Sequence, residues 1–207
     1  MARAISVTEL YNKKRKELPL SANWVAHIGI PEPSGTMLIW GDSSNGKTSY
    51  ALQLAKELTR FGRVLYNSME EGDSKTMVAA FKRVGMEDVR RRIVLLDNES
   101  IDDLDVRLSK KKAPRIVFID TVQYAELTFK RYKELKEKHP SVLFIYLSHE
   151  DGKLPDGKVA QKIRRDAPIK TRVEGFKAFP TSRYGGGEPY IISQEKADAY
   201  WGSFDNK

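Results

Sequence analysis

Residues 36–48 read TMLIWGDSSNGKT and decide how the chain folds. The apolar letters MLIW (37–40) predict a buried strand, which breaks directly into GDSSNGKT (41–48). This octapeptide fits the phosphate-binding-loop pattern, GxxxxGK followed by Ser or Thr. The next ten residues, SYALQLAKEL (49–58), carry apolar side chains at helical spacing. This order of strand, loop and helix predicts a nucleoside triphosphate site and disfavours the alternative, a glycine-containing turn that binds nothing.

Each part of the loop has a physical role in holding a triphosphate. Gly41 and Gly46 let the backbone turn its N–H groups inward, at the positive end of the helix that follows. Lys47 can reach the β- and γ-phosphates, and the hydroxyl of Thr48 can coordinate Mg²⁺. The residues expected to contact ATP are Gly41, Asp42, Ser43, Ser44, Asn45, Gly46, Lys47, Thr48 and Ser49.

The composition describes an ordinary globular domain. The chain has 207 residues, of which 40% are hydrophobic and 31% charged, enough to bury one core. No apolar stretch approaches the roughly 20 residues of a membrane span, and MARAISVTEL has no signal-peptide core. The absence of Cys excludes disulfides, and three scattered His do not suggest a zinc site. We therefore expect a cytoplasmic protein with no membrane partner.

Positive charge is concentrated in one part of the chain. The net charge of +8 points to an acidic partner such as nucleic acid. Residues 153–187 contain nine basic and three acidic side chains and so carry +6 of that total. A smaller basic run at 110–112 precedes a predicted strand and is typical of a solvated helix end.

Strands and helices alternate after the phosphate loop. Continuous apolar runs predict strands at 63–68, 93–96, 115–120 and 142–147. Helical spacing predicts helices at 74–84, 101–110 and 129–138. Alternation of this kind around a phosphate loop predicts a three-layer α/β domain with a mostly parallel central sheet.

The two ends of the chain follow other patterns. Ser6 and Glu9 form a capping box that predicts a basic amphipathic helix to about Leu18, before a Pro-punctuated extended lead-in. From about Pro168, apolar and polar residues alternate, which predicts a C-terminal β-hairpin extension and a last short strand near 190–193. The final dozen residues, with Trp201 and Phe204, predict no element.

Carboxylates follow two of the predicted strands. RIVFID (115–120) is an apolar strand ending in Asp120, as in a Walker B element that orients Mg²⁺ beside Thr48. Glu70 and Glu71 follow the strand at 63–68, and the carboxyl ends of parallel strands share one edge of a sheet. A glutamate carboxylate at this edge can orient or deprotonate the water that attacks ATP during hydrolysis. The alternatives are an ordinary turn aspartate and two solvated loop acids.

Four ordered segments together resemble the RecA-like ATPases, most closely the branch that contains RadA/Sms and the DnaB-type helicases. They are VLYNSMEEG (64–72), FIDTVQ (118–123), YLSHEDG (146–152) and TSRYGGGE (181–188). The resemblance covers roughly residues 24–193. It implies three parts: an N-terminal helix and lead-in (1–23), a RecA-like ATPase core (24–193) and a C-terminal tail (194–207).

The resemblance also implies roles for individual residues. Glu70 is the water-activating glutamate, and Gln123 is a signature residue beside the Walker B aspartate. His149 lies where the γ-phosphate sensor begins, and Arg183 is the arginine that reaches the ATP of a neighbouring subunit. Full activity would then require a ring or filament. The alternatives are a partly buried polar group for His149 and a solvated hairpin arginine for Arg183.

Departures from the family limit what can be carried over. The chain has no zinc module, no protease-like domain and no primase-contact domain. The lysine that accompanies the arginine finger is missing from TSR (181–183), and Lys177 is a candidate replacement. The chain therefore resembles a stand-alone RecA-type core, of a kind common in phages and mobile elements.

The basic segment is the candidate nucleic-acid surface. Such surfaces track phosphates with Lys and Arg and offer aromatic rings for stacking, as Phe176, Phe179 and Tyr184 do here. The alternative is a solvated lid. The residues expected to contact DNA are Lys158, Lys162, Arg164, Arg165, Lys170 and Arg172.

These features predict an ATPase that uses ATP and Mg²⁺ and couples hydrolysis to DNA binding or remodelling. The expected partners are DNA, in single-stranded form, and further copies of the chain. The rival is a regulatory ATP-binding switch of KaiC-like or partition type that acts on a protein partner. A small-molecule kinase is disfavoured by the Glu70 segment and the long basic region.

Overall fold

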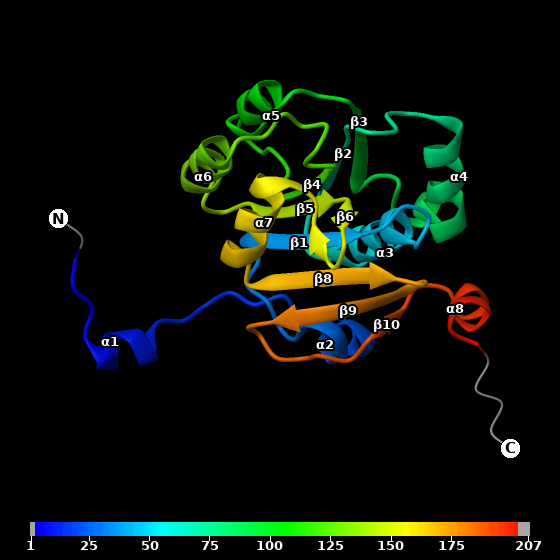
Figure 1. The fold of residues 1–207 in the computed structure, drawn as a ribbon. Coiled ribbons are helices and arrows are strands. Elements are labelled where there is room, and N and C mark those ends of the chain that lie inside the picture. The colour runs from blue at the N-terminus through cyan, green and yellow to red at the C-terminus, as the bar shows by residue number, and fades with distance from the viewer. Residues whose placement is uncertain (1–2, 203–207) are drawn as a thin grey trace, which may run out of the picture.

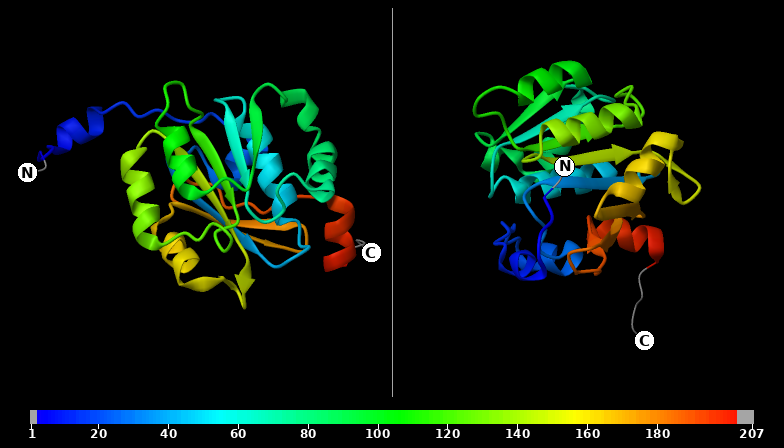
Figure 2. Two further views of the ribbon diagram at one scale, coloured as in Figure 1. Left: turned by 90° about the horizontal axis from the view of Figure 1, so that it is seen from above. Right: turned by 90° about the vertical axis from the view of Figure 1, so that its left-hand side faces the viewer.

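The computed structural model describes residues 3–202, and an eight-stranded sheet runs through its centre (Figures 1 and 2). The strands of this sheet are β1 (Gly35–Gly41), β2 (Val64–Ser68), β3 (Ile93–Asp97), β4 (Ile116–Asp120), β5 (Leu143–Ser148), β8 (Ile169–Glu174), β9 (Lys177–Ser182) and β10 (Tyr190–Ile191). Their order across the sheet is β10-β9-β8-β1-β5-β4-β2-β3. A separate two-stranded hairpin is formed by β6 (Glu150–Asp151) and β7 (Leu154–Pro155).

Strands β1 to β5 and β8 are parallel, so their carboxyl ends share one edge of the sheet. The phosphate loop follows β1, between β5 and β8 in the sheet order. Ser68 at the end of β2 lies opposite Asp120 at the end of β4. The register therefore brings the ends of two predicted site segments together beside the loop.

Helices cover both faces of the sheet. One face carries α2 (Ala22–Ile28), α3 (Lys47–Leu58) and α4 (Lys75–Val84), and the other carries α5 (Ile101–Leu108), α6 (Phe129–Lys138) and α7 (Gly157–Asp166). Alternate residues of β1 serve the two cores: Met37 and Ile39 face the first, and Leu38 and Trp40 face the second. The predicted three-layer α/β fold is confirmed.

Local signals fix both ends of α4 (Lys75–Val84) close to where the sequence predicts them. The hydroxyl of Ser74 accepts a hydrogen bond from the backbone of Met77, which caps α4, and Gly85 ends the helix in the left-handed region at φ 69°. A short 3₁₀-helix, η1 (Met86–Val89), follows. This N-cap and C-cap pair explains why the predicted and observed bounds of α4 nearly coincide.

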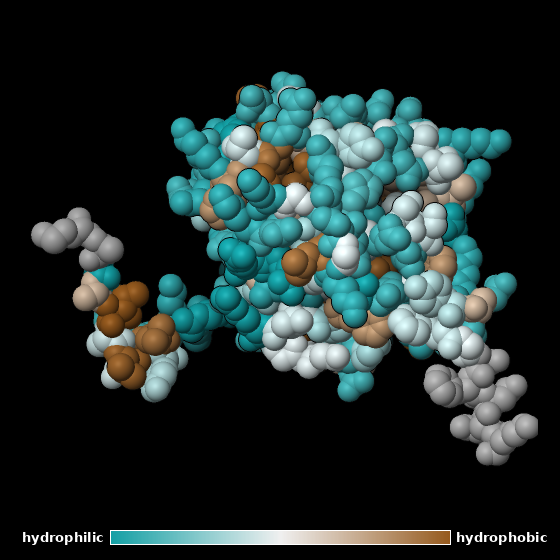
Figure 3. Space-filling view, viewed as in Figure 1, coloured by the Kyte–Doolittle hydropathy of each residue, from teal (hydrophilic) through white to brown (hydrophobic). Residues whose placement is uncertain are grey.

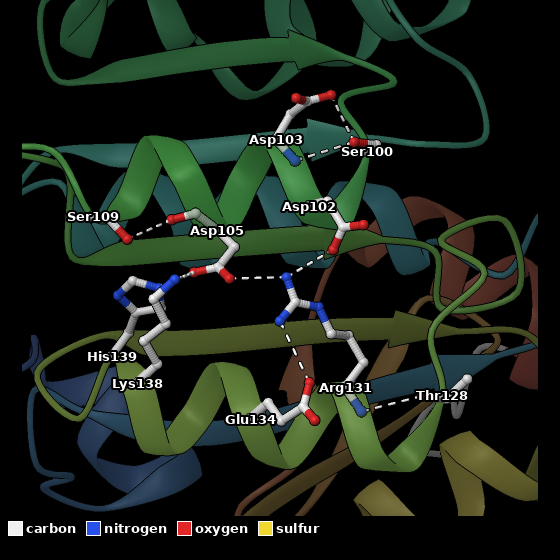
Figure 4. Close-up of polar contacts among 10 residues, drawn as sticks. All are labelled: Ser100, Asp102, Asp103, Asp105, Ser109, Thr128, Arg131, Glu134, Lys138 and His139. Atoms are coloured by element: carbon white, nitrogen blue, oxygen red, sulfur yellow. Dashed lines mark hydrogen bonds and ion pairs between the residues drawn. The ribbon is translucent and has the colours of Figure 1, made fainter.

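A cluster of charges joins α5 to α6 on the second face (Figure 4). Asp105 is 6% exposed, and its Oδ1 accepts from His139 Nε2 at 2.7 Å and lies 2.8 Å from Lys138 Nζ. Its Oδ2 accepts from Arg131 Nη2 at 2.8 Å. Burial raises the pKa of Asp105, but the bonds from Lys138, His139 and Arg131 outweigh it and lower the pKa to about 2. The carboxylate is therefore charged at neutral pH and fastens the two helices together.

The N-terminal helix is shorter than predicted. Its capping box between Ser6 and Glu9 is present, but α1 spans only Val7–Asn12 and contains no buried residue. The chain then runs extended to Leu18, which is buried and donates its backbone N–H to the carbonyl of Pro31. The helix does not reach Leu18 because that side chain packs into the core from an extended backbone. The predicted lead-in after it also contains a helix, α2, that the sequence analysis did not predict.

The C-terminal region agrees with the prediction in part. The predicted hairpin is present as β8 and β9, and β8 also pairs in parallel with β1, so that the hairpin continues the central sheet. Two helices, α7 and α8 (Gln194–Trp201), were not predicted. Residues 203–207 of the predicted tail, with Phe204, lie outside the described residues. No helix within 3–202 is both long enough and apolar enough to cross a membrane.

Candidate functional site

The loop at 41–48 leaves β1 and enters α3 through two glycines that other residues could not replace. A Cβ on Gly41 would lie 2.3 Å from the carbonyl oxygen of Val173 in β8. Gly46 has φ 98°, and a Cβ there would lie 2.9 Å from the ring of Phe176. Close packing of β8 and of the turn after it therefore fixes the path of the loop at the N-terminus of α3.

Lys47 lies inside the loop, buried above the sheet edge. Its Nζ donates to the carbonyl oxygen of Gly41 at 3.1 Å. Burial lowers the pKa of Lys47, while the charges of Asp120 and Glu70 act in the opposite direction. An ammonium held in this way is available to an anion that enters the loop.

Asp120 lies beside Lys47 at the end of β4 and is 4% exposed. Its Oδ2 accepts a hydrogen bond from the hydroxyl of Tyr66 at 2.6 Å. Burial raises the pKa of Asp120 to about 6, against the lowering effects of the Tyr66 bond and the Lys47 charge. Burial therefore disfavours the charged form of Asp120. A cation bound beside the carboxylate would stabilise that charged form.

Glu70 is fastened to the same aspartate through the backbone. The carbonyl of Asp120 accepts from the N–H of Met69 at 2.6 Å and from that of Glu70 at 3.2 Å. The Oε2 of Glu70 lies 3.4 Å from the Nε2 of His149, which follows β5. Glu71 also lines the cavity beside the loop, but its Oε2 is engaged by α4, where it accepts from the hydroxyl of Thr76 at 2.5 Å. Of the two predicted carboxylates, Glu70 is the one that lies near His149.

Gln123 links His149 to the start of α7 through hydrogen bonds. Its Nε2 donates to the Ser148 hydroxyl and to the carbonyl of Asp156, each at 2.9 Å, and its Oε1 accepts from the N–H of His149. Asp156 in turn donates its N–H to the carbonyl of His149 and is the N-cap residue of α7. A continuous set of hydrogen bonds thus joins the segment after β4 to the start of α7.

The loop opens onto a cavity of about 350 Å³ at this edge of the sheet. The residues of its lining that the sequence analysis assigns to the site are Asp42, Ser43, Ser44, Gly46, Lys47, Thr48, Ser49, Glu70 and His149. Asn45 is different, because its Oδ1 accepts from the N–H of Gly175 at 2.7 Å and so faces the β8–β9 turn. Most of the predicted ATP contacts therefore meet at one hollow, and Asn45 anchors the neighbouring turn.

The residues near the loop fit a Mg²⁺ ion that also binds phosphate. Within residues 3–202 no three His, Cys, Asp or Glu gather into a protein-only metal site. Mg²⁺ bound with a nucleotide needs only one or two protein ligands, together with phosphates and water. Thr48 and Asp120 can supply these, and the buried hydroxyls of Ser68 and Thr121 have no partner among the described residues. Each of these hydroxyls can accept a hydrogen bond from a metal-bound water molecule or donate one to it.

Three further residues line the cavity that the sequence analysis did not place there: Arg83 of α4, Phe176 of the β8–β9 turn and Lys196 of α8. Arg83 Nη1 donates to the Ser49 hydroxyl at 3.3 Å. The sequence carried no signal for Lys196, because its position depends on how α8 packs. Phe176 was a candidate for stacking on DNA bases, but its ring lies against Gly46 of the loop.

Arg183 does not approach the phosphate loop of its own subunit. It follows β9, which runs antiparallel to β8, and its N–H donates to Pro168 at the start of β8. Arg183 is exposed at the opposite edge of the sheet. Lys177 begins β9, so the two residues lie roughly 20 Å apart along the strand. Lys177 is therefore wrongly placed to replace the lysine that accompanies the arginine finger.

The predicted DNA-contacting residues divide into two groups. Arg172 is paired with Glu150 at 2.7 Å and with Glu174 at 2.7 Å, so its charge is neutralised within the chain. Arg164 lies over the ring of Trp40 at 5.3 Å, and Lys170 is half-buried. The others are exposed on α7 at positions i, i+4 and i+7, which form one stripe: Lys158, Lys162 and Arg165.

Comparison with solved structures shows a shared fold at low sequence identity. The chain is similar to a KaiC-like protein of the hyperthermophilic archaeon Pyrococcus horikoshii, with a TM-score of 0.55 and 18% identity over 77% of this chain and 85% of that chain. It is also similar to the flagellar accessory protein FlaH of Methanocaldococcus jannaschii, with a TM-score of 0.58 and 16% identity over 86% and 97%. The RecA-like P-loop fold is thereby confirmed.

Sequence comparison adds nothing to this fold. No protein-family model matches the chain, and no curated protein sequence matches it.

Proposed function

We propose that the chain is an ATPase of RecA-like type, with Glu70 as the group that activates water. The observation that carries this proposal is the convergence of Lys47, Asp120 and Glu70 at the carboxyl edge of the sheet. Asp120 hydrogen-bonds the backbone of Glu70, and its carboxylate interacts with the charge of Lys47. Phosphate release from ATP, measured with Mg²⁺ on the wild-type chain and on Lys47→Ala and Glu70→Gln variants, tests the proposal.

Each residue then has a defined task. The loop N–H groups and Lys47 bind the β- and γ-phosphates and stabilise the charge that develops in the transition state. Thr48 and Asp120 would hold Mg²⁺, which when bound neutralises phosphate charge. The carboxylate of Glu70 accepts a proton from the attacking water, and His149, 3.4 Å away, senses whether the γ-phosphate is present.

We further propose that nucleotide state is coupled to DNA binding through α7. The hydrogen bonds from Gln123 to Ser148, His149 and Asp156 connect the sensor to the first residues of this helix. The stripe of Lys158, Lys162 and Arg165 is exposed, and the ammonium of Lys162 also lies 5.3 Å from the centre of the Phe129 ring. Its spacing and charge, with the resemblance to the RadA and DnaB branch, support single-stranded DNA as the ligand.

Reversing the three charges of the α7 stripe to Glu is expected to weaken DNA binding for every sequence. Each phosphate contact on a single strand contributes about −0.7 to the slope of log K against log salt, so the slope should flatten by up to about 2. Fluorescence anisotropy with a labelled oligonucleotide at several salt concentrations measures this.

The matched control reverses Lys110, Lys111 and Lys112, which are exposed and produce the same change in net charge. Equal loss of binding in the two triple variants would remove the α7 stripe as the DNA surface. Failure of the wild-type chain to bind DNA in any nucleotide state would favour the regulatory switch that acts on a protein partner.

We also propose that copies of the chain assemble head to tail through α1. This helix extends away from the body in Figure 1, and Figure 3 shows brown, hydrophobic residues on it. The exposed apolar residues of this arm are Ile5, Val7, Leu10 and Tyr11. An apolar groove of about 460 Å³ lies on the opposite side of the molecule, lined by residues that include Met77, Val78, Phe81, Met86, Ile93 and Leu95.

An arm and a groove on different surfaces form a heterologous contact, which generates rings or filaments. Sedimentation velocity at increasing protein concentration should show assembly that Leu10→Asp with Tyr11→Asp abolishes, and that Val78→Asp in the groove also abolishes. Val106 is 61% exposed on α5 and outside both surfaces, so Val106→Asp should assemble as wild type. Assembly by the arm variant equal to that of wild type would contradict the contact.

A further inference from the structure

The C-terminal helix α8 packs against the turn between β8 and β9 (Figure 1). The indole N–H of Trp201 donates to the carbonyl of Gly175 at 3.0 Å. The packing is close, because a Cβ on Gly175 would lie 2.2 Å from the ring of Tyr200. Helix α8 therefore has a defined position on this turn.

The same turn is fastened to the phosphate loop. Asn45 accepts two hydrogen bonds from it, from Gly175 N–H on Oδ1 at 2.7 Å and from Phe176 N–H on the backbone carbonyl at 3.1 Å. Ile192, just before α8, donates its N–H to the carbonyl of Phe176 at 2.9 Å and accepts a bond from Gln53 of α3. The loop, the turn and the start of α8 are thus one connected unit.

Lys196 extends from α8 toward the phosphate cavity that it helps to line. Its Nζ lies 4.9 Å from the centre of the Phe176 ring, and that ring also lies close to Gly46 of the loop. Among the described residues, no acidic oxygen lies within 4.0 Å of this ammonium, whereas Lys56 and Lys136 elsewhere are paired with Asp88 and Asp166. Within residues 3–202, Lys196 is therefore a cation beside the loop with no ion-pair partner.

We infer that Lys196 binds the phosphates of the nucleotide within its own subunit, as a second lysine of the site beside Lys47. This inference rests on the proposed ATPase function. Three acidic residues, Asp42, Glu70 and Glu71, line the same cavity and oppose the entry of a polyanion. A second ammonium at the same cavity offsets that repulsion. Unlike Arg183, Lys196 needs no neighbouring subunit to act.

The test is equilibrium binding of Mg–ATP and Mg–ADP to the full chain, at a protein concentration too low for assembly. Lys196→Met removes the charge and keeps an aliphatic stem over Phe176. We expect affinity for ATP to fall about 10-fold, the value of one exposed charge-assisted hydrogen bond. Lys196→Arg should retain affinity within about 3-fold, because it keeps the charge.

Lys177→Met is the matched control. Lys177 lies over the ring of Trp201 at 5.5 Å, on the same unit but outside the cavity, and its loss should leave ATP affinity unchanged. Equal ATP affinity in wild type and Lys196→Met, or equal losses in Lys196→Met and Lys177→Met, would overturn the inference. Loss of affinity in Lys196→Arg as large as in Lys196→Met would also overturn it, because packing would then be the cause.

The two proposals fail in different ways. If wild type and Lys47→Ala both show no ATP binding, the proposed function fails and the inference fails with it. If wild type binds ATP and Lys47→Ala does not, the site is a nucleotide site, and only Lys196→Met decides the role of Lys196. Thermal unfolding without nucleotide, which should be the same for wild type and Lys196→Met, excludes a folding defect.

Discussion

Glu70→Gln is expected to lower kcat for ATP hydrolysis by about 10²–10⁴-fold, the usual contribution of a positioned general base. Glutamine keeps the shape of the side chain but cannot accept a proton from water. Affinity for ATP should change little, because the loop and Lys47 hold the phosphates. Turnover from phosphate release and affinity from equilibrium binding, measured on the same preparations, separate the two effects.

Glu71→Gln is the control for this prediction. Glu71 is adjacent in sequence, but its carboxylate accepts from the hydroxyl of Thr76 at 2.5 Å, whereas Glu70 faces His149. The Glu71→Gln variant should therefore retain most of its turnover. If Glu71→Gln were the inactive variant and Glu70→Gln the active one, the water-activating role would belong to Glu71. The assignment made from the resemblance of residues 64–72 would then be wrong by one residue.

Lys47→Ala is expected to weaken ATP binding by roughly 10²–10³-fold, because truncating one partner of a buried charge pair costs about 2–5 kcal/mol. Lys47 is 8% exposed and is the buried cation at the centre of the loop. The fold should survive, because within residues 3–202 the ammonium of Lys47 donates a hydrogen bond only to the Gly41 carbonyl. Isothermal titration with Mg–ATP measures the loss, and circular dichroism checks the fold.

Lys56→Ala provides a control from the same helix. Lys56 Nζ pairs with Asp88 at 2.8 Å, on a part of α3 that does not line the phosphate cavity, so its loss should leave ATP affinity unchanged. Affinity of Lys47→Ala equal to that of wild type would show that the loop does not bind the triphosphate.

Much of the fold was predictable because its signals are local. The apolar runs that became β1, β2, β4 and β5 are buried on both faces, and such strands need no partner to be recognised in the sequence. The cap pair at Ser74 and Gly85 likewise acts within one helix. The loop residues, Asp120 and Glu70 were placed together because carboxyl ends of parallel strands share an edge.

The missed elements depend on contacts between distant segments. Helix α2 lies between prolines at 19, 31 and 33, and these prolines predict an extended chain. The helix forms because Trp24 and Ile28 are buried in the core. Helix α7 follows Pro155 and begins at Gly157, and these residues concealed the apolar spacing of Ala160 and Ile163.

Two side chains show the same limit at the site. The charge of Arg172 and the family resemblance predict a DNA contact, but Glu150 of β6, 22 residues earlier, neutralises that charge at 2.7 Å. Lys196 reaches the cavity only because α8 packs on the β8–β9 turn. Neither the ion pair of Arg172 nor the position of Lys196 follows from residue spacing, since both depend on tertiary packing.

The most direct test of the central claim is the release of phosphate from ATP by the purified wild-type chain, at protein concentrations that permit assembly and with single-stranded DNA present or absent. We predict many turnovers per subunit with Mg²⁺, and none after chelation of the metal or in Lys47→Ala. Tight Mg–ATP binding without phosphate release under every one of these conditions would contradict hydrolysis and leave a nucleotide-binding switch.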